Sequence, residues 1–157
     1  MESNSKVATL QENQLAVKSP TCELIRCPSL SNLKPYIDIT IPMRLYSEMN
    51  VREHWAKKYK RWKDQKYRLF ANLIAFAPHG PYPLPCIVKL TRIAPRKFDG
   101  DNLQASFKHL RDCIAGLLIP LKNSGHADSS PLITWIYDQK KGGVREYAIQ
   151  VQIYKNG

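Results

Sequence analysis

The chain has 157 residues, a hydrophobic fraction of 43% and a formal net charge of +11. This length corresponds to one domain, and the apolar content argues against a disordered protein. No run approaches the roughly 18 apolar residues of a membrane span, and the N-terminus lacks the order of a signal peptide, so we expect no membrane segment and a cytoplasmic location. The 24 lysines and arginines against 13 acids favour a polyanionic partner such as nucleic acid, although many basic proteins bind none.

The first part of the chain, residues 1–35, is polar and is interrupted by three prolines, which predicts a flexible N-terminal extension. The globular domain is expected over residues 36–157. It begins with a strand in YIDITIPMRL, residues 36–45, because Ile37, Ile39 and Ile41 alternate with polar residues.

A long amphipathic helix is predicted next, within residues 46–76. Its apolar residues recur at three- and four-residue intervals, as on a helix face turned to a core: Trp55, Tyr59, Trp62, Leu69, Leu73 and Phe76. Asn50 is a suitable N-cap, and Glu53 follows at the capping-box distance. The other faces are basic and carry Lys57, Lys58, Lys60, Arg61, Lys63, Lys66 and Arg68. Most such surfaces are only solvated, but one with so few acids favours contacts with phosphate.

The remaining elements complete an α+β fold. A second strand is expected in CIVKLTRIAP, residues 86–95, followed by a helix that begins at Asp101 and Asn102 and by a loop over residues 120–131. The segments LITWIYDQ and VREYAIQVQIY flank KKGG, which predicts a β-hairpin. The order strand, helix, strand, helix, strand, strand predicts a small sheet packed against two helices.

The stretch KFDGDNLQASFKHLRD, residues 97–112, concentrates acids in this basic chain. Projection at about 100° per residue places Asp101, Lys108 and Asp112 opposite the apolar stripe of the helix. An extended approach points Asp99 in the same direction as Asp101. Because converging carboxylates repel, a bound cation would stabilise them, and hard oxygen ligands suit Mg²⁺ or Mn²⁺. The hypothesis is a metal site that acts on a phosphodiester, with Lys108 stabilising negative charge.

A purely structural interpretation fits the same residues. Asp101 caps the helix, Asp99 is a turn residue, and Lys108 with Asp112 forms a surface ion pair at four-residue spacing. Asp128, in GHADSSP, either supplies a further metal ligand from a loop or is a plain polar loop residue. For an arbitrary helix with this pattern, the structural interpretation is the commoner one.

The combination of DGDNLQASFKHLRD, a later acidic loop and the upstream MNVREHWAKKYKRWKDQ resembles the RusA family of phage- and prophage-derived Holliday junction resolvases, over about residues 37–154. The resemblance implies a homodimeric, Mg²⁺-dependent endonuclease that makes paired incisions in four-way DNA junctions. It assigns Asp99, Asp101 and Asp128 to the metal site and matches Asn102 to the asparagine that follows the family's aspartates. A twofold dimer suits a substrate with two symmetric strands to cut.

The resemblance also implies where DNA lies. An Asn/Arg/His cluster of the family's phage branch matches MNVREHW and would meet the DNA backbone, with the basic helix as the phosphate track. The residues expected to contact DNA are Asn50, Arg52, His54, Lys57, Lys58, Lys60, Arg61, Lys63 and Asn102. The alternative, in which Asn50 is only a cap and His54 packs under Trp55, stays open.

The chain departs from the family pattern in three places. Ala105 stands where the family has a lysine, and Lys108 follows one turn later. Ala127 replaces one of two adjacent loop acids, and IPLKNSG before that loop looks inserted. The last two departures favour one alternative, a branched-DNA-binding relative that does not cleave. A second alternative, a general or RNA-directed nuclease, would use the same metal site.

Overall fold

The computed structural model describes residues 30, 33–47, 52–76, 82–120 and 124–156. The chain divides into two compact units, Met1–Ser31 and Asn32–Gly157. Asn50 and nearly all of the predicted extension over residues 1–35 lie outside the described residues. The elements are β1 (Ile37–Ile41), α1 (Trp55–Phe76), β2 (Cys86–Ala94), α2 (Gly100–Leu118), α3 (Ser124–Ala127), β3 (Ile133–Lys141) and β4 (Ala148–Lys155), all within the second unit.

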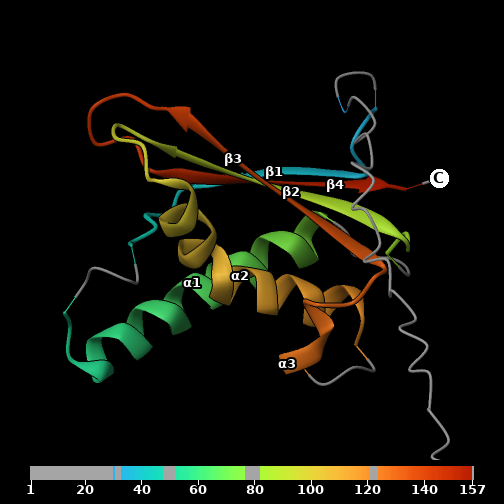
Figure 1. The fold of residues 1–157 in the computed structure, drawn as a ribbon, viewed down its shortest axis with the longest axis horizontal. Helices are drawn as coiled ribbons and strands as arrows, with labels where there is room; N and C mark the ends of the chain where they lie inside the picture. The colour runs from blue at the N-terminus through green and yellow to red at the C-terminus, as the bar shows by residue number, and fades with distance from the viewer. Residues whose placement is uncertain (1–29, 31–32, 48–51, 77–81, 121–123, 157) are drawn as a thin grey trace, which may run out of the picture. The chain divides into compact units, whose positions relative to one another are not determined.

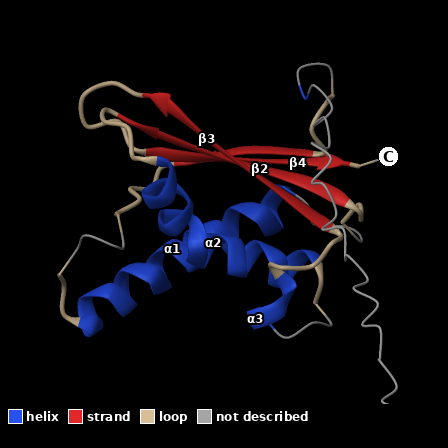
Figure 2. Ribbon diagram, in the orientation of Figure 1, coloured by secondary structure: helices blue, strands red, loops and turns tan. Residues whose placement is uncertain are grey.

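The second unit is a four-stranded sheet with α1 and α2 packed on one face (Figures 1 and 2). The strand order is β1-β4-β2-β3; β2 and β3 are parallel, and the other neighbours are antiparallel. The crossover from β2 to its parallel neighbour passes through α2, as parallel pairing requires. The predicted α+β class and the alternation of strands and helices are therefore confirmed, with the short α3 added in the predicted loop.

The predicted hairpin is wrong. Strands β3 and β4 follow one another in the chain, but β2 lies between them and pairs with both. The connection crosses the end of β2, where the Gly142 amide donates to the carbonyl of Ala94 at 3.0 Å. The reason is burial: Ile149, Val151 and Ile153 of β4 are fully buried, so β4 takes a central position, whereas the half-exposed β3 forms an edge.

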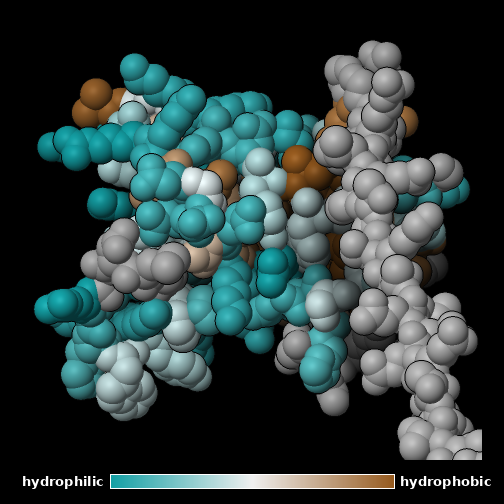
Figure 3. All heavy atoms as spheres, viewed as in Figure 1, coloured by the Kyte–Doolittle hydropathy of each residue, from teal (hydrophilic) through white to brown (hydrophobic). Residues whose placement is uncertain are grey.

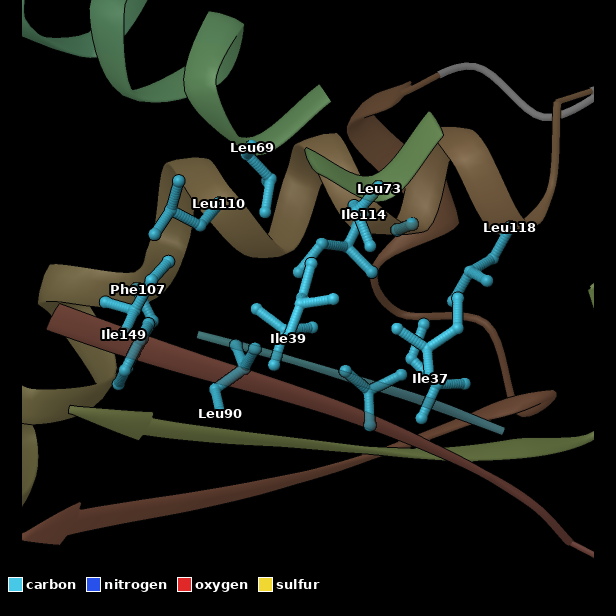
Figure 4. Packing of buried hydrophobic residues seen from close by; sticks show 14 of the residues in the cluster. Ile37, Ile39, Leu69, Leu73, Leu90, Phe107, Leu110, Ile114, Leu118 and Ile149 are labelled. Carbon is cyan, nitrogen blue, oxygen red and sulfur yellow. The ribbon is translucent and has the colours of Figure 1, made fainter. Parts of the chain in front are cut away.

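The core lies between the helices and the near face of the sheet (Figure 4). From α1, Leu69 and Leu73 point toward the strands. The apolar stripe predicted for the second helix is confirmed except at Leu117, which is only half-buried; the buried members are Leu103, Phe107, Leu110, Ile114 and Leu118. On the sheet, one cross-strand row of this core consists of Ile39, Val151, Leu90 and Tyr137.

The buried face of α1 is shorter than predicted. Trp55, Tyr59 and Phe76 were expected in the core, but they are 73%, 59% and 64% exposed. Lengths explain the difference: a 22-residue helix is about 33 Å long, whereas the five residues of β1 span about 17 Å. The buried residues of α1, Gln65, Leu69 and Leu73, lie between its middle and its C-terminal end, so its first turns and its last residue extend beyond the core.

The face of the sheet opposite the helices carries polar pairs. Asp38 accepts hydrogen bonds from Gln150 and Gln152 at 2.8 and 2.9 Å, and Lys89 pairs with Asp138 at 2.9 Å. Among the described residues, no helix has the length and apolar character needed to cross a membrane.

The Lys89–Asp138 pair predicts a pH-dependent stability. The hydrogen bond from Lys89 lowers the pKa of Asp138 below 3.8, against the opposing effect of burial. Because the folded-state pKa is depressed, the pair stabilises the fold above the ordinary carboxyl pKa, and this contribution is lost as pH falls through the folded value. Asp138→Asn should lower the free energy of unfolding by at most about 1 kcal/mol at pH 7. Urea unfolding at neutral and strongly acidic pH checks this; an equal difference at both would contradict it.

Candidate functional site

The loop from β2 to α2 presents Asp99 and Asp101 at the start of α2. Gln139 of β3 fixes the position of this loop. Its side chain accepts a hydrogen bond from the Phe98 amide at 2.9 Å and donates one to the Phe98 carbonyl at 2.8 Å. Asp99 is the N-cap residue with extended backbone (φ −67°, ψ 158°), and its carbonyl accepts from the Leu103 amide at 2.8 Å. The strand end and the helix start thus hold the two aspartates two residues apart.

Both carboxylates are exposed and, within the described residues, neither forms a side-chain hydrogen bond or an ion pair. Asp99 occupies the cap position without a side-chain cap bond, so the interpretation of Asp101 as the helix cap is wrong. Several other acids pair with cations: Glu53 with Arg61, Asp64 with Arg68, Asp128 with Arg111 and Asp138 with Lys89. Asp99 and Asp101 are consequently open to a ligand from solvent.

Asn102 is a structural contact as well as a neighbour of these carboxylates. Its side chain is half-buried, and its Oδ1 accepts a hydrogen bond from Ser47 Oγ at 2.6 Å. Ser47 belongs to the segment that follows β1. The bond therefore joins this segment to the first turn of α2.

Asp128 lies elsewhere in the structure. Its Oδ2 accepts from Arg111 Nη2 at 2.6 Å, and its carbonyl accepts from Trp135 Nε1 at 2.8 Å. Arg111 also donates to the Tyr137 hydroxyl at 3.1 Å. Since Arg111 comes ten residues after Asp101 on α2, about 15 Å along the helix axis, Asp128 is held toward a different part of this helix.

The three predicted metal ligands are thus not assembled as one group. Among the described residues, no set of three or more histidine, cysteine, aspartate or glutamate side chains is placed to hold a metal ion. The start of α2 offers two carboxylate ligands, Asp99 and Asp101. Two are enough for Mg²⁺, which keeps several waters and takes further oxygens from a phosphate substrate.

Lys108 and Asp112 lie farther along α2. Lys108 is exposed and comes two helical turns after Asp101 rather than one; Asp112 is half-buried one turn beyond it. Burial and the negative charge of Asp128 raise the pKa of Asp112, while Arg111 and other nearby cations oppose this shift. Asp112 therefore interacts electrostatically with Asp128. The predicted Lys108–Asp112 ion pair is not formed.

The start of α1 is organised by His54. Its carbonyl accepts from the Lys57 amide at 3.0 Å, and its Nδ1 accepts from the Ala56 amide at 3.3 Å, so His54 caps a helix that begins at Trp55. Both His54 and Trp55 are exposed, and their ring centroids lie 5.8 Å apart, so the two rings contact each other at the surface. Glu53 pairs with Arg61 instead of completing a capping box.

The basic residues of α1 fall into two groups: those in contact with other side chains of the protein, and those that are exposed and could contact a ligand. The Arg61 guanidinium also lies 4.6 Å from the centroid of the Tyr46 ring, and Lys58 Nζ lies 4.9 Å from that of Trp62. Lys57, Lys60 and Lys63 are exposed, and their three-residue spacing keeps them on one side of the helix. Arg52, just before the helix, is also exposed. The side of the unit shown in Figure 3 is mostly hydrophilic.

A pocket beside Asp99 was missed by sequence reasoning. It has a volume of about 300 Å³ and is lined by residues that include Arg44, Tyr46, Arg92, Arg96, Phe98 and Tyr147. The sequence did contain a signal, because Arg92 occupies the same side of β2 as Val88 and Leu90. A charged residue on the apolar side of a strand indicates that this side chain borders something other than the hydrophobic core. A larger groove of about 630 Å³ lies between α1 and α2, at the Asp112 end of α2.

Comparison with known proteins adds no relative. No protein-family model matches this chain, and no curated protein matches it in sequence. Its function is therefore inferred from its residues, their geometry and the resemblance carried by its acidic stretch.

Proposed function

We propose that the chain is a Mg²⁺-dependent, structure-specific endodeoxyribonuclease that resolves four-way DNA junctions by paired phosphodiester hydrolysis, in DNA recombination and repair. The observation that supports this most directly is the pair of exposed carboxylates at the start of α2. Asp99 and Asp101 have no cationic partner among the described residues, although the chain has a net charge of +11. Such a pair in a basic protein suits a divalent cation placed against phosphate.

The donor set fits Mg²⁺, and Mn²⁺ as the alternative, because both cations prefer carboxylate, water and phosphate oxygens. Asp99 and Asp101 would hold the ion. A cation bound there supplies polarisation of the phosphodiester and a lower pKa for the attacking water. Asp128 would join these ligands only if its ion pair with Arg111 opened and its loop moved toward the start of α2.

Other residues of the chain would position the DNA. Carboxylates repel a phosphate backbone, so the track of Arg52, Lys57, Lys60 and Lys63 would supply the attraction, without reading sequence. Lys108, on the same side of α2 as Asp101, would stabilise negative charge on the phosphate or the leaving oxygen. A homodimer in the cytoplasm would present two such sites to the two symmetric strands of a junction.

A second candidate is a protein of the same fold that binds branched DNA without cleaving it. The ion pair of Asp128 with Arg111 favours this candidate, because it leaves two rather than three carboxylates at the start of α2. This candidate predicts salt-sensitive junction binding and no metal-dependent product.

The test is incubation of the purified protein with a labelled immobile four-way junction, with and without Mg²⁺, beside flap, duplex and RNA substrates at matched salt. Symmetric nicks in the junction alone, formed only with Mg²⁺, are expected. Tight binding without cutting in Mg²⁺ or Mn²⁺ would favour the binding protein. Cutting of duplex or RNA as efficiently as the junction would favour a general nuclease. The solution mass of the same preparation should be twice the 18.0 kDa of the chain.

A further inference from the structure

Arg92 lies on the side of β2 that faces the core, in line with the buried Val88 and Leu90. The cross-strand row that contains it, read from β1 to β3, is Ile41, Ile149, Arg92 and Gln139. The next row toward the centre of the core is Ile39, Val151, Leu90 and Tyr137. Arg92 is only 5% exposed. Because arginine stays protonated in proteins, this row carries a buried positive charge.

No acidic side chain in the described part of the chain neutralises this buried charge on Arg92. Its Nη1 donates to the Arg96 carbonyl at 2.6 Å, whereas its buried Nε has no hydrogen-bond partner. Burial lowers the pKa of Arg92. The charge of Arg44 lowers this pKa further, whereas Tyr147 raises it. A buried cation in these surroundings is costly, and a bound anion would remove that cost.

The pocket beside Arg92 has the chemistry of an anion site. Among the described residues, its lining includes three arginines, Arg44, Arg92 and Arg96, and no acidic residue. The Arg44 guanidinium lies 5.0 and 4.7 Å from the ring centroids of Tyr46 and Tyr147, and that of Arg92 lies 3.6 Å from the centroid of Phe98. These stacking contacts restrict the guanidinium groups, so their donors are positioned before a ligand arrives. Guanidinium donors match the oxygens of a phosphate.

The pocket adjoins the exposed carboxylates. Phe98, which lines it, directly precedes Asp99 in the chain. Ser47, also in the lining, donates to Asn102 at 2.6 Å and so joins the pocket to the first turn of α2. A cationic pocket and a pair of carboxylates thus lie next to each other at one end of the sheet.

We propose that this pocket binds one backbone phosphate of the DNA substrate, with Arg92 as the central ligand and Arg44 and Arg96 beside it. The inference deepens the proposed function and rests on it for the identity of the substrate. A phosphate held there belongs to a nucleotide neighbouring the one that faces Asp99 and Asp101. The contact fixes the position of the strand over the carboxylates without reading sequence.

Thermal unfolding in sodium chloride and in sodium phosphate at equal ionic strength tests the anion site without DNA. Arg92→Met keeps an unbranched apolar side chain and removes the charge. In chloride its Tm should equal or exceed that of the wild type, because an unpaired buried charge is gone. Phosphate should raise the Tm of the wild type more than that of Arg92→Met. Lys155→Gln, an exposed site at the far end of β4, measures the general stabilisation by phosphate and should respond as the wild type does.

Junction binding in EDTA tests the same pocket with its proposed ligand. Arg92→Met should weaken the affinity roughly tenfold, since a charged hydrogen-bonded contact is lost. It should also reduce the slope of log affinity against log salt by about one. Lys155→Gln should leave both unchanged. If Arg92→Met does not fold, Arg44→Gln takes its place, since Arg44 is exposed. This variant should lower both the junction affinity and the salt slope, by smaller amounts.

The inference is overturned if Arg92→Met loses several degrees of Tm in both salts while its junction binding equals that of the wild type. Arg92 would then be only a structural residue. These readouts need neither metal nor cleavage. A wild type that responds to phosphate through Arg92 but never cuts DNA would contradict the proposed nuclease and leave the phosphate pocket standing.

Discussion

Asp101→Asn is expected to reduce Mg²⁺-dependent cleavage of a four-way junction by about a hundredfold or more, because an amide oxygen is a poorer ligand than a carboxylate and one of two proposed ligands is lost. Junction binding measured without metal should persist or strengthen, since removing a negative charge reduces repulsion against phosphate. Asp101 is exposed and has no side-chain partner among the described residues, so the free energy of unfolding should change by less than about 0.5 kcal/mol.

Asp138→Asn is the matched control for this measurement. It makes the same change in charge, but its carboxylate pairs with Lys89 on the sheet face opposite the helices. Cleavage by this control should equal that of the wild type at neutral pH. If Asp101→Asn cuts the junction as well as the wild type, the metal site is wrongly placed; if both variants lose activity, net charge rather than a metal ligand explains the effect.

Phe107→Ala is expected to lower the free energy of unfolding by about 3–5 kcal/mol. The ring is completely buried, lies 6.0 Å from the Tyr137 ring between centroids, and is directed at the sheet near Ile149 (Figure 4). The expected loss is a large part of the roughly 5–15 kcal/mol that stabilises a typical domain. Urea unfolding followed by circular dichroism measures it.

Leu117→Ala, on the same helix, is the control for Phe107→Ala. Leu117 is only half-buried, so its truncation leaves a smaller cavity and should cost clearly less. Equal losses for the two variants would show that α2 does not turn Phe107, rather than Leu117, toward the centre of the core. Since α2 also carries Asp101, this orientation decides which side of the helix reaches solvent.

Local periodicity predicted much of the fold. The alternation of Ile37, Ile39 and Ile41 identified β1, and the three- and four-residue repeat of Leu103, Phe107 and Leu110 identified the buried side of α2. Both patterns depend only on which side of an element faces the core, and neighbouring residues record that directly. The adjacency of Asp99 and Asp101 is local in the same sense.

Strand neighbours and the ends of α1 were not predictable in this way. KKGG lies between two consecutive strands, but the fully apolar inner side of β4 places it between β1 and β2. The pattern of α1 includes Trp55 and Phe76, yet only Gln65, Leu69 and Leu73 are buried, because the helix is longer than the short β1. Both outcomes depend on competition for burial among segments that are distant in the chain.

The sequence by itself determined the four strands and the two long helices, the buried side of β1 and of α2, and the two neighbouring aspartates, because these follow from spacing along a single segment. Only the tertiary structure decided that Asp128 pairs with Arg111 and that Arg92 lines a pocket beside Asp99. Such contacts join side chains from separate elements. They are selected by the packing of the whole sheet against its helices, which no local pattern records.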